Sequence, residues 1–387
     1  MQFALTQDQA LIAESARDWL AGHYDFRARE QGVHRDGGSA AVWAAWGELG
    51  WLALPLPAVH GGIEGGPLEA GLLMQALGRH LAVEPYVSGV LQAARLLSLA
   101  GSAAQQDRWL PPSASGRARL ALAHDETQMR SPWDLPGCTL QRNGAQWVLS
   151  GSKASASGAV GADAWLVSAV EPATGRLRIA VVPAGASGAR VEAHDTTDGA
   201  RAADLHFDAV SLGQDAVLGE QDQDVRASLE RVVAEGIVAH CWEATGVMQA
   251  SMEQTARYVR ERRQFGKALA EFQVIQHRLA EMLVQCTEAQ AACELAAMRL
   301  ARDRNVQDVA AAARSKVTRA ARYVAQECVQ LHGAMGVCEE LPIASAFRSM
   351  LAFCARGGNG KIHAQRLGER LLSTGSHEHS VTLGAAA

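Results

Sequence analysis

A short segment between two long helical patterns carries side chains that suit the binding of a charged diphosphate. It contains Arg262, Gln264, Phe265 and Gln273 in sequence order, with Gly266 near its centre. Arginine binds pairs of phosphate oxygens and stays charged at any working pH. Two arginines alone would serve equally well as caps at the end of a helix. Because capping needs neither the amides nor the aromatic rings that follow, the segment predicts a diphosphate site at a helix–loop–helix corner.

A second group of residues could move a proton. Glu243 lies in the apolar run Cys241–Gly246, where an unpaired carboxylate is costly. Ionisable groups in such surroundings are enriched at functional sites, although a buried ion pair with an arginine is the competing explanation. Glu235 lies two helical turns earlier, and His332 and His363 are further candidates. We expect Glu243 or Glu235 to act as a catalytic base.

The composition sets limits on the class of protein. The 387 residues suggest roughly two or three domains, and 36 basic against 41 acidic residues give a mildly negative chain. No basic run with interleaved aromatics is present, so we expect no nucleic-acid binding. We also expect neither a signal peptide nor a membrane span, since no apolar run approaches the required length of about 18 residues. Seven cysteines without a metal-type C-x-x-C pair are typical of a reduced, cytoplasmic protein without a bound metal.

Three regions with different periodicity must position these side chains. Residues 1–118 have a helical pattern, residues 119–222 alternate with a period of two, and residues 223–387 are helical again. Asn143-Gly144 between strand-like arms predicts a hairpin. The predicted fold is α+β: a helical domain, a β-barrel or sandwich domain, and a four-helix bundle. The expected strands span 140–150 (a hairpin), 164–170, 177–182 and 203–210, and the bundle helices 225–260, 272–302, 306–331, 343–353 and 361–372.

Four motifs occur in the order and at the intervals found in the acyl-CoA dehydrogenase flavoprotein family. They are Phe3–Gln9, Leu49–Pro55, Arg262–Gly266 and Gln330–Gly336. The chain resembles that family over nearly its whole length. It is especially similar to the small subunits of bacterial two-component enzymes, in Glu243-Ala244-x-Gly246 and in the Gln330 motif. The resemblance implies the same three-domain fold and a dimer or dimer of dimers, either of identical chains or with a paralogous subunit.

The resemblance also implies FAD as cofactor, held between the β domain and the bundle, with its diphosphate and adenosine reaching a neighbouring subunit. The implied contacts to the adjacent chain's cofactor are Arg262, Gln264, Phe265, Gln273, Gln330, Gly333 and Ala334. Asp125, Ser155 and Ser157 fall where the family contacts the flavin ring, although the two serines could equally be ordinary strand residues. The family's Trp-containing continuation after Gly-x-Lys is absent here.

The implied reaction is oxidation of an acyl-CoA thioester to the trans-2-enoyl-CoA, with electrons passed to an electron-transfer flavoprotein. The family usually takes its base from a position that here is Gly357, and in some members from a position that here is Gly236. Neither glycine can accept a proton. Two alternatives therefore remain open. The chain could be a non-catalytic subunit that completes a paralogue's flavin site, or a flavin oxidase or monooxygenase on the same scaffold.

Overall fold

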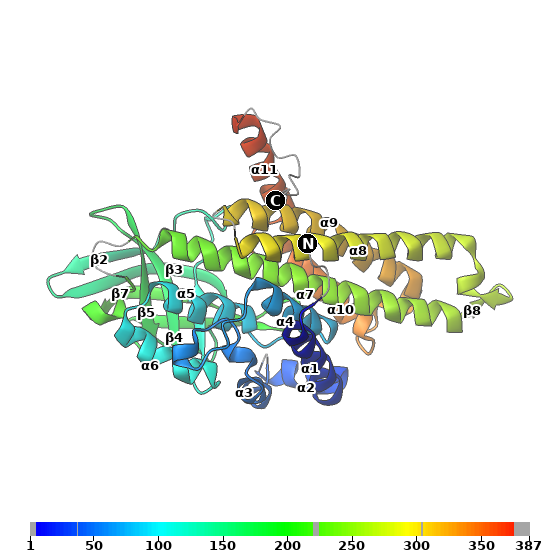
Figure 1. Ribbon diagram of the computed structural model, residues 1–387, viewed down its shortest axis with the longest axis horizontal. Helices are drawn as coiled ribbons and strands as arrows, with labels where there is room; N and C mark the ends of the chain where they lie inside the picture. Colours follow the sequence, from blue (N-terminus) through cyan, green and yellow to red (C-terminus); the bar gives the residue numbers. More distant parts are fainter. Residues whose placement is uncertain (1–4, 37, 220–223, 303–304, 375–387) are drawn as a thin grey trace.

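The structure, a computed structural model, describes residues 5–36, 38–219, 224–302 and 305–374. The start of the N-terminal motif, Phe3-Ala4, and the last residues of the predicted bundle domain, 375–387, lie outside this part of the chain. The molecule is elongated, with a sheet at one end and a helical bundle that extends to the other (Figure 1). The N-terminal helices pack below both, against the sheet and the first bundle helix.

The N-terminal region is helical because its helices carry strong start signals. The Thr6 hydroxyl and the Gln9 side chain form a reciprocal capping box, and Pro67 begins a helix whose first turn is closed by Glu69. The helices are α1 Gln7–His23, α2 Phe26–Asp36, α3 Ala40–Glu48, α4 Pro67–Arg79, the π-helical η3 Val87–Ala94, α5 Arg95–Ala100 and α6 Ala103–Ala114, with short 3₁₀ turns at η1 Trp51–Ala53 and η2 Ala58–His60.

The middle region forms one curled seven-stranded sheet in the order β1-β4-β2-β3-β7-β6, with β5 paired to β4. The predicted hairpin is present, since Asn143 pairs with Gln146 across a turn in which Gly144 has φ 62°. Strand β6 was not predicted because it lies at the sheet edge and shows no buried alternation. The strands are β1 Leu120–Ala123, β2 Thr139–Asn143, β3 Gln146–Ser157, β4 Ala164–Glu171, β5 Arg176–Pro183, β6 Ala189–Asp195 and β7 Arg201–Leu212.

The C-terminal region begins with α7, a helix of 36 residues and therefore about 54 Å long. It packs antiparallel to α8, which in turn packs against α9, while α11 packs on the start of α9 and its far end stands out from the bundle (Figure 1). All five predicted helices are present, with ends within two residues of the predicted ones. The elements are α7 Arg226–Glu261, β8 Arg263–Gln264, β9 Lys267–Ala268, α8 Gln273–Leu300, α9 Val306–His332, α10 Pro342–Ala355 and α11 Gly360–Thr374, with 3₁₀ turns at η4 Gln214–Ala216, η5 Leu269–Glu271 and η6 Gly333–Val337.

Helices α4 and α7 approach each other closely because glycines line their contact. A Cβ atom added at Gly246 would lie 2.0 Å from the backbone oxygen of Gln75, and one added at Gly78 would lie 2.0 Å from the backbone oxygen of Glu243. This contact fixes the position of α7 over the N-terminal region. None of the helices in the described residues is long and apolar enough to cross a membrane.

Candidate functional site

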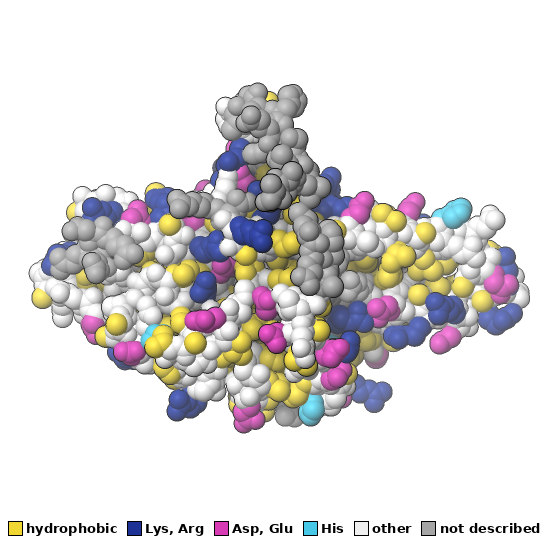
Figure 2. Space-filling model, viewed as in Figure 1, with side chains coloured by type: hydrophobic (Ala, Val, Ile, Leu, Met, Phe, Trp, Pro, Cys, Tyr) yellow, Lys and Arg dark blue, Asp and Glu magenta, His cyan; other side chains and the backbone are white. Residues whose placement is uncertain are grey.

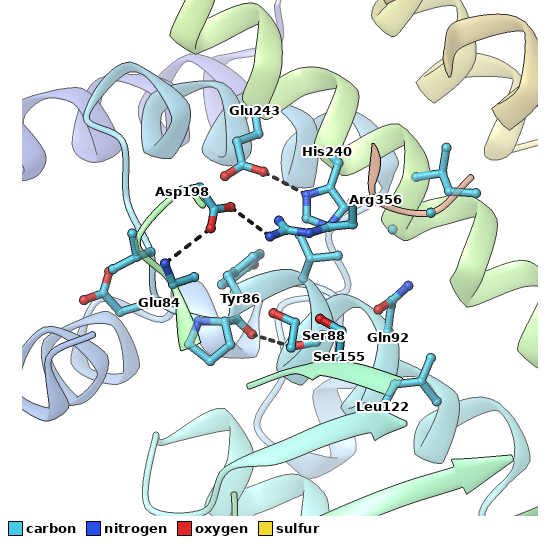
Figure 3. A pocket seen from close by; sticks show the side chains of 18 of the residues that line it. Glu84, Tyr86, Ser88, Gln92, Leu122, Ser155, Asp198, His240, Glu243 and Arg356 are labelled. Carbon is cyan, nitrogen blue, oxygen red and sulfur yellow. Dashed lines mark hydrogen bonds and ion pairs between the residues drawn. The ribbon is translucent and has the colours of Figure 1, made fainter. Parts of the chain in front are cut away.

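A cavity of about 140 Å³ lies where the three regions of the fold meet. Its walls come from α4 and η3, from β3, from the turn between β6 and β7, from α7 and from the segment after α10 (Figure 3). Several of the lining side chains are charged or titratable. They include Asp125, Asp198, His240, Glu243 and Arg356.

Gly236 and Gly357, the two glycines expected at the family's base positions, both line this cavity. Gly236 is buried on α7, and Gly357 follows α10, where an added Cβ would lie 3.6 Å from Ile237 of α7. The carboxamide of Gln92 fills the space beside Gly236, since an added Cβ would lie 2.4 Å from its Nε2. Gly357 has φ 62°, and its backbone oxygen lies 2.9 Å from Nε2 of His363. The cavity therefore has no side chain at either expected base position.

Glu243 lies at the cavity and is paired with a histidine rather than with an arginine. Its Oε2 atom is 2.8 Å from Nδ1 of His240, and both side chains are about one fifth exposed (Figure 3). Gly236, His240 and Glu243 share one face of α7, because positions four and seven residues apart return to the same side of a helix. Burial lowers the pKa of His240, although the hydrogen bond and charge of Glu243 act in the opposite direction.

An ion pair lies beside Glu243 and His240 in the cavity wall (Figure 3). Asp198, in the turn between β6 and β7, accepts a hydrogen bond of 2.8 Å from Arg356, and its backbone oxygen accepts one of 2.7 Å from Arg29 of α2. Burial alone would raise the pKa of Asp198, but the charge of Arg356 and a hydrogen bond from Thr196 hold it below the ordinary value. These contacts join the N-terminal region, the sheet and the bundle at a single residue.

The sheet contributes the predicted ring-contact residues, and all three line the cavity. Ser155 has φ 48° at a bulge between β3 and β7, its N–H donates to Asp204 at 2.7 Å, and its Oγ lies 3.2 Å from Nε2 of His194. Ser157 has no recorded hydrogen bond to its hydroxyl within the described residues. Asp125 is exposed and its backbone oxygen accepts the N–H of Ala154. Of the two serines, only Ser157 keeps an uncommitted hydroxyl toward the cavity.

A buried polar network supports this strand from behind. The ammonium group of Lys153 donates to Glu126 at 2.6 Å and to Ser168 at 3.0 Å. Nδ1 of His124 lies 2.8 Å from the same serine hydroxyl. Burial lowers the pKa of Lys153 and would raise that of Glu126, but the Lys153 hydrogen bond and charge bring the pKa of Glu126 below its ordinary value. The network fixes β3 beneath Ser155 and Ser157.

The predicted diphosphate corner lies at the far end of α7. A two-residue turn joins β8 to β9, and Phe265 and Gly266 at its tip have φ 53° and 83°, as a type I′ turn requires. Phe265 is 91% exposed, and its ring meets that of Phe272 edge-on at 6.3 Å. No hydrogen bond or ion pair is recorded for the guanidinium of Arg262 within the described part of the chain. Among the described residues, the corner thus presents an exposed aromatic ring and a guanidinium group that makes no hydrogen bond or ion pair.

The glycine motif at the end of α9 is brought to the same end of the bundle. The ring of Tyr258 stacks on that of His332 at 4.4 Å, and its hydroxyl donates to the backbone oxygen of His332. Gly333 ends α9 with φ 60° and ψ −139°, a conformation nearly confined to glycine. Gln330, Gly333 and Ala334 are exposed beside it, as is Gln273 at the start of α8.

The remaining candidate bases lie elsewhere. Glu235 does not line the cavity: its carboxylate accepts a hydrogen bond from Arg231 at 2.7 Å and faces Arg95 at 3.8 Å. The ion-pair explanation therefore applies to Glu235 and not to Glu243. His332 belongs to the corner, and His363 supports the turn at Gly357. Sequence reasoning missed His240, Asp198 and Arg356; of these, His240 could have been found because it follows Gly236 by one helical turn.

Two family models match this chain. The acyl-CoA dehydrogenase N-terminal domain matches residues 6–117, and the acyl-CoA dehydrogenase C-terminal domain matches residues 228–372. The chain belongs to the acyl-CoA dehydrogenase family, whose members are FAD-dependent oxidoreductases acting on CH–CH bonds of acyl-CoA. The family assignment and the three-part fold predicted from the sequence are thereby confirmed.

Relatives and solved structures cover most of the chain. Acyl-CoA dehydrogenase FadE28 of Mycobacterium tuberculosis is 30% identical, over 86% of this chain and 93% of the relative. The mouse mitochondrial long-chain specific acyl-CoA dehydrogenase is 27% identical over 87% of this chain and 80% of its own length. The structure of a variant of the Tcur3481-Tcur3483 steroid ACAD is 28% identical with a TM-score of 0.86, covering 95% of this chain and 98% of that one. The ChsE4-ChsE5 complex of M. tuberculosis is 25% identical with a TM-score of 0.87, covering 96% and 99%.

The described residues fit FAD in two separate places. The cavity offers Ser157 and the bulged strand at Ser155, while the corner offers the free guanidinium of Arg262 and the exposed ring of Phe265. Nineteen residues of α7 separate Glu243 from Arg262, which corresponds to about 28 Å. The inner cavity and the outward corner therefore lie at two separate places along α7.

Proposed function

We propose that this chain is a subunit of an FAD-dependent acyl-CoA dehydrogenase that introduces a trans-2,3 double bond into a CoA thioester. The observation that carries the proposal is the separation along α7 of an outward, uncommitted corner from an inner cavity. When bound, FAD would accept the hydride that leaves the substrate's β-carbon. The chain's own residues bind the cofactor, exclude water and hold the proton that leaves the α-carbon. An electron-transfer flavoprotein is the proposed electron acceptor.

The proposal includes an oligomer in which the corner serves an adjacent chain. The exposed surface of α8 supports this, because apolar side chains gather along it (Figure 2). Leu283, Val284 and Leu295 are each more than 50% exposed. Exposed apolar side chains grouped on one helix mark interaction surfaces more often than isolated ones do. We propose a paralogous chain as the partner, as in the relative described as a complex of ChsE4 and ChsE5.

A second function is favoured by the cavity's chemistry. Pockets for acyl groups are mostly apolar, whereas this cavity has glycine at both usual base positions and contains the pair of Asp198 with Arg356. In this second proposal the chain makes no enoyl-CoA in its own cavity. It completes the flavin site of its paralogue through the corner at Arg262.

One experiment separates the two proposals. The chain is purified alone and together with a co-expressed paralogous acyl-CoA dehydrogenase chain, and flavin absorbance and acyl-CoA-dependent dye reduction are measured for both samples. The substrates include straight-chain and steroid-ring CoA thioesters, because one of the similar structures is that of a steroid ACAD. Flavin and turnover only in the joint sample support a two-chain enzyme. Full flavin and turnover in the lone chain contradict the need for a paralogue, and turnover in neither sample contradicts the dehydrogenase proposal.

The corner is tested by removing its cation. We expect Arg262→Met to lower the flavin content of the assembled protein at least fivefold, since a charge-assisted contact to the cofactor is lost, with the melting temperature of the flavin-free protein unchanged. Arg260→Met is the matched control, because Arg260 is an exposed arginine in the last turn of α7. An equal loss of flavin in both variants would show that general charge, not the corner, holds the cofactor.

A further inference from the structure

His240 occupies the part of the cavity wall where the family's bases are missing. It follows Gly236 by four residues on α7, so its side chain shares the helix face that a base at position 236 would use. Its imidazole lines the cavity together with Gly236 and Gly357. The carboxamide of Gln92 fills the space beside Gly236 and cannot serve as a base. One helical turn further along α7, the imidazole of His240 is the first titratable side chain that lines the cavity.

The hydrogen bond to Glu243 selects one tautomer of the ring. A carboxylate can only accept, so the Nδ1 atom 2.8 Å from Oε2 of Glu243 must carry the proton. The other nitrogen, Nε2, then keeps its lone pair. No hydrogen bond to Nε2 is recorded among the described residues, and one fifth of the side chain remains exposed. This is the arrangement that catalytic histidines use, in which a carboxylate orients the ring and the far nitrogen accepts a proton.

We propose that His240 Nε2 accepts the α-proton of the bound thioester and that Glu243 is its positioning residue. This inference rests on the proposed dehydrogenase function and names the base that neither glycine can supply. In the proposed step the α C–H bond breaks, an N–H bond forms at Nε2, and the electron pair moves into the thioester to give its enolate. The imidazolium formed at Nε2 is stabilised by the Glu243 carboxylate at Nδ1. The later loss of the β-hydride uses FAD as oxidant.

The electrostatic surroundings keep the ring neutral and ready to accept. Burial lowers the pKa of His240, and the positive charges of Arg356 and Arg314 lower it further, while Glu243 raises it. Arg356 follows α10 and Arg314 lies on α9; Asp198, from the turn between β6 and β7, lines the same cavity. Near pH 7 the imidazole is therefore unprotonated. Proton abstraction should fall as pH falls through the pKa of His240.

The test measures proton transfer without oxidation. The assembled flavoprotein is incubated in D₂O with a 3-thiaacyl-CoA, whose β-position is sulfur and has no hydride to lose, and deuterium at the α-carbon is followed by mass spectrometry. We expect His240→Gln to slow the exchange about 100-fold or more, the typical contribution of a positioned base. His80→Gln is the matched control, since His80 is a half-buried histidine outside this cavity whose pKa burial also lowers. We expect the control to exchange within twofold of the unaltered protein.

Glu243→Gln tests the positioning role through a readout that a merely structural residue would not change. Loss of the carboxylate lowers the pKa of His240, so the acid limb of the exchange rate should move to lower pH, and turnover should fall at least tenfold. In the flavin-free protein with nitrogen-labelled histidine, the ¹⁵N spectrum should show His240 protonated at Nδ1, and Glu243→Gln should weaken that preference, because an amide can donate as well as accept.

The possible outcomes separate the assignment of His240 as base from the proposed dehydrogenase function. Undiminished exchange in His240→Gln, with enoyl-CoA still formed by the unaltered protein, overturns His240 as base and leaves the dehydrogenase proposal standing. An Nε2-protonated ring in the unaltered protein overturns the assignment without any variant. Absence of both exchange and enoyl-CoA in the unaltered assembly overturns the dehydrogenase proposal and the base assignment together.

Discussion

Lys153 illustrates how a single residue beneath the site affects stability. The residue is 1% exposed, and its ammonium group donates hydrogen bonds to the backbone oxygen of His124, the carboxylate of Glu126 and the hydroxyl of Ser168. Glu126 also accepts the backbone N–H groups of Gly137 and Cys138. A buried pair of this kind contributes little compared with a well-packed apolar pair, but breaking it leaves one charge without a partner. Removal of only one of the two side chains should therefore lower the stability of the strand β3 that carries Lys153.

We expect Lys153→Met to lower the free energy of unfolding by about 3–5 kcal/mol, because the Glu126 carboxylate is left buried and unpaired. The measurement is urea denaturation at pH 7. Adding Glu126→Gln should recover part of the loss, since the remaining buried group is then neutral. Lys316→Met is the matched control: Lys316 pairs with Glu288 at a partly exposed site, where about 1 kcal/mol or less is expected. Equal losses at both lysines would contradict the role given to burial.

At the scale of the elements, α7 depends on its glycine contact with α4. The backbones of the two helices approach so closely at Gly246 and Gly78 that no Cβ atom fits at either position. His240 and Glu243 lie on the same stretch of α7, so this contact also fixes where the imidazole meets the cavity. The packing of α4 on α7 therefore also positions the side chain that we propose as the base.

Gly246→Ala should lower the free energy of unfolding by about 1–3 kcal/mol, because the added methyl must push α4 away from α7. Thermal denaturation of the assembled protein provides the measurement. Gly22→Ala, in α1, is the control: nothing lies within 4 Å of its added Cβ, and replacing glycine inside a helix is expected to stabilise by about 0.5–1 kcal/mol. A stabilising effect at both positions would show that α4 and α7 can separate freely.

The sequence predicted elements well where local signals and burial agree. Pro67 and Asn143-Gly144 mark their helix start and hairpin turn because each residue favours the backbone conformation found there. Strand β6 was not predicted because an exposed edge strand has no alternation of apolar and polar residues. The predicted corner and cavity residues are placed in two clusters, but their binding roles stay predictions. Asp198 was missed because its partners, Arg29 and Arg356, are 169 and 158 residues away in the chain.

For the whole molecule, the turn at Asp198 joins all three regions. Its side chain binds Arg356 at the end of α10, and its backbone oxygen binds Arg29 of α2, while the turn itself belongs to the sheet. Residues that hold several regions together affect their relative position as well as their stability. A weakened turn should therefore make the three regions unfold less cooperatively before it lowers the stability of any one of them.

Asp198→Asn should lower the free energy of unfolding by about 1–3 kcal/mol at pH 7, because Arg356 loses its anionic partner in a partly exposed setting. The folded pKa of Asp198 lies below its ordinary value of 3.8, so its contribution is present above that pH and is lost as pH falls through the folded pKa. Urea midpoints should therefore differ steadily from pH 7 to about 4 and converge below. Midpoints that differ equally at every pH would mean that the carboxylate's charge is not responsible.

The length of α7 bears on how a gene pair encoding such subunits can diverge after duplication. The turn proposed to accept the proton and the corner proposed to bind the cofactor are about 28 Å apart on one helix, so substitutions at one end leave the other intact. A duplicated copy can lose its chemistry at residues 236–243 and still be retained by selection for the corner at Arg262. Division of labour between paralogues then requires no change of fold, only mutations within two turns of a single helix.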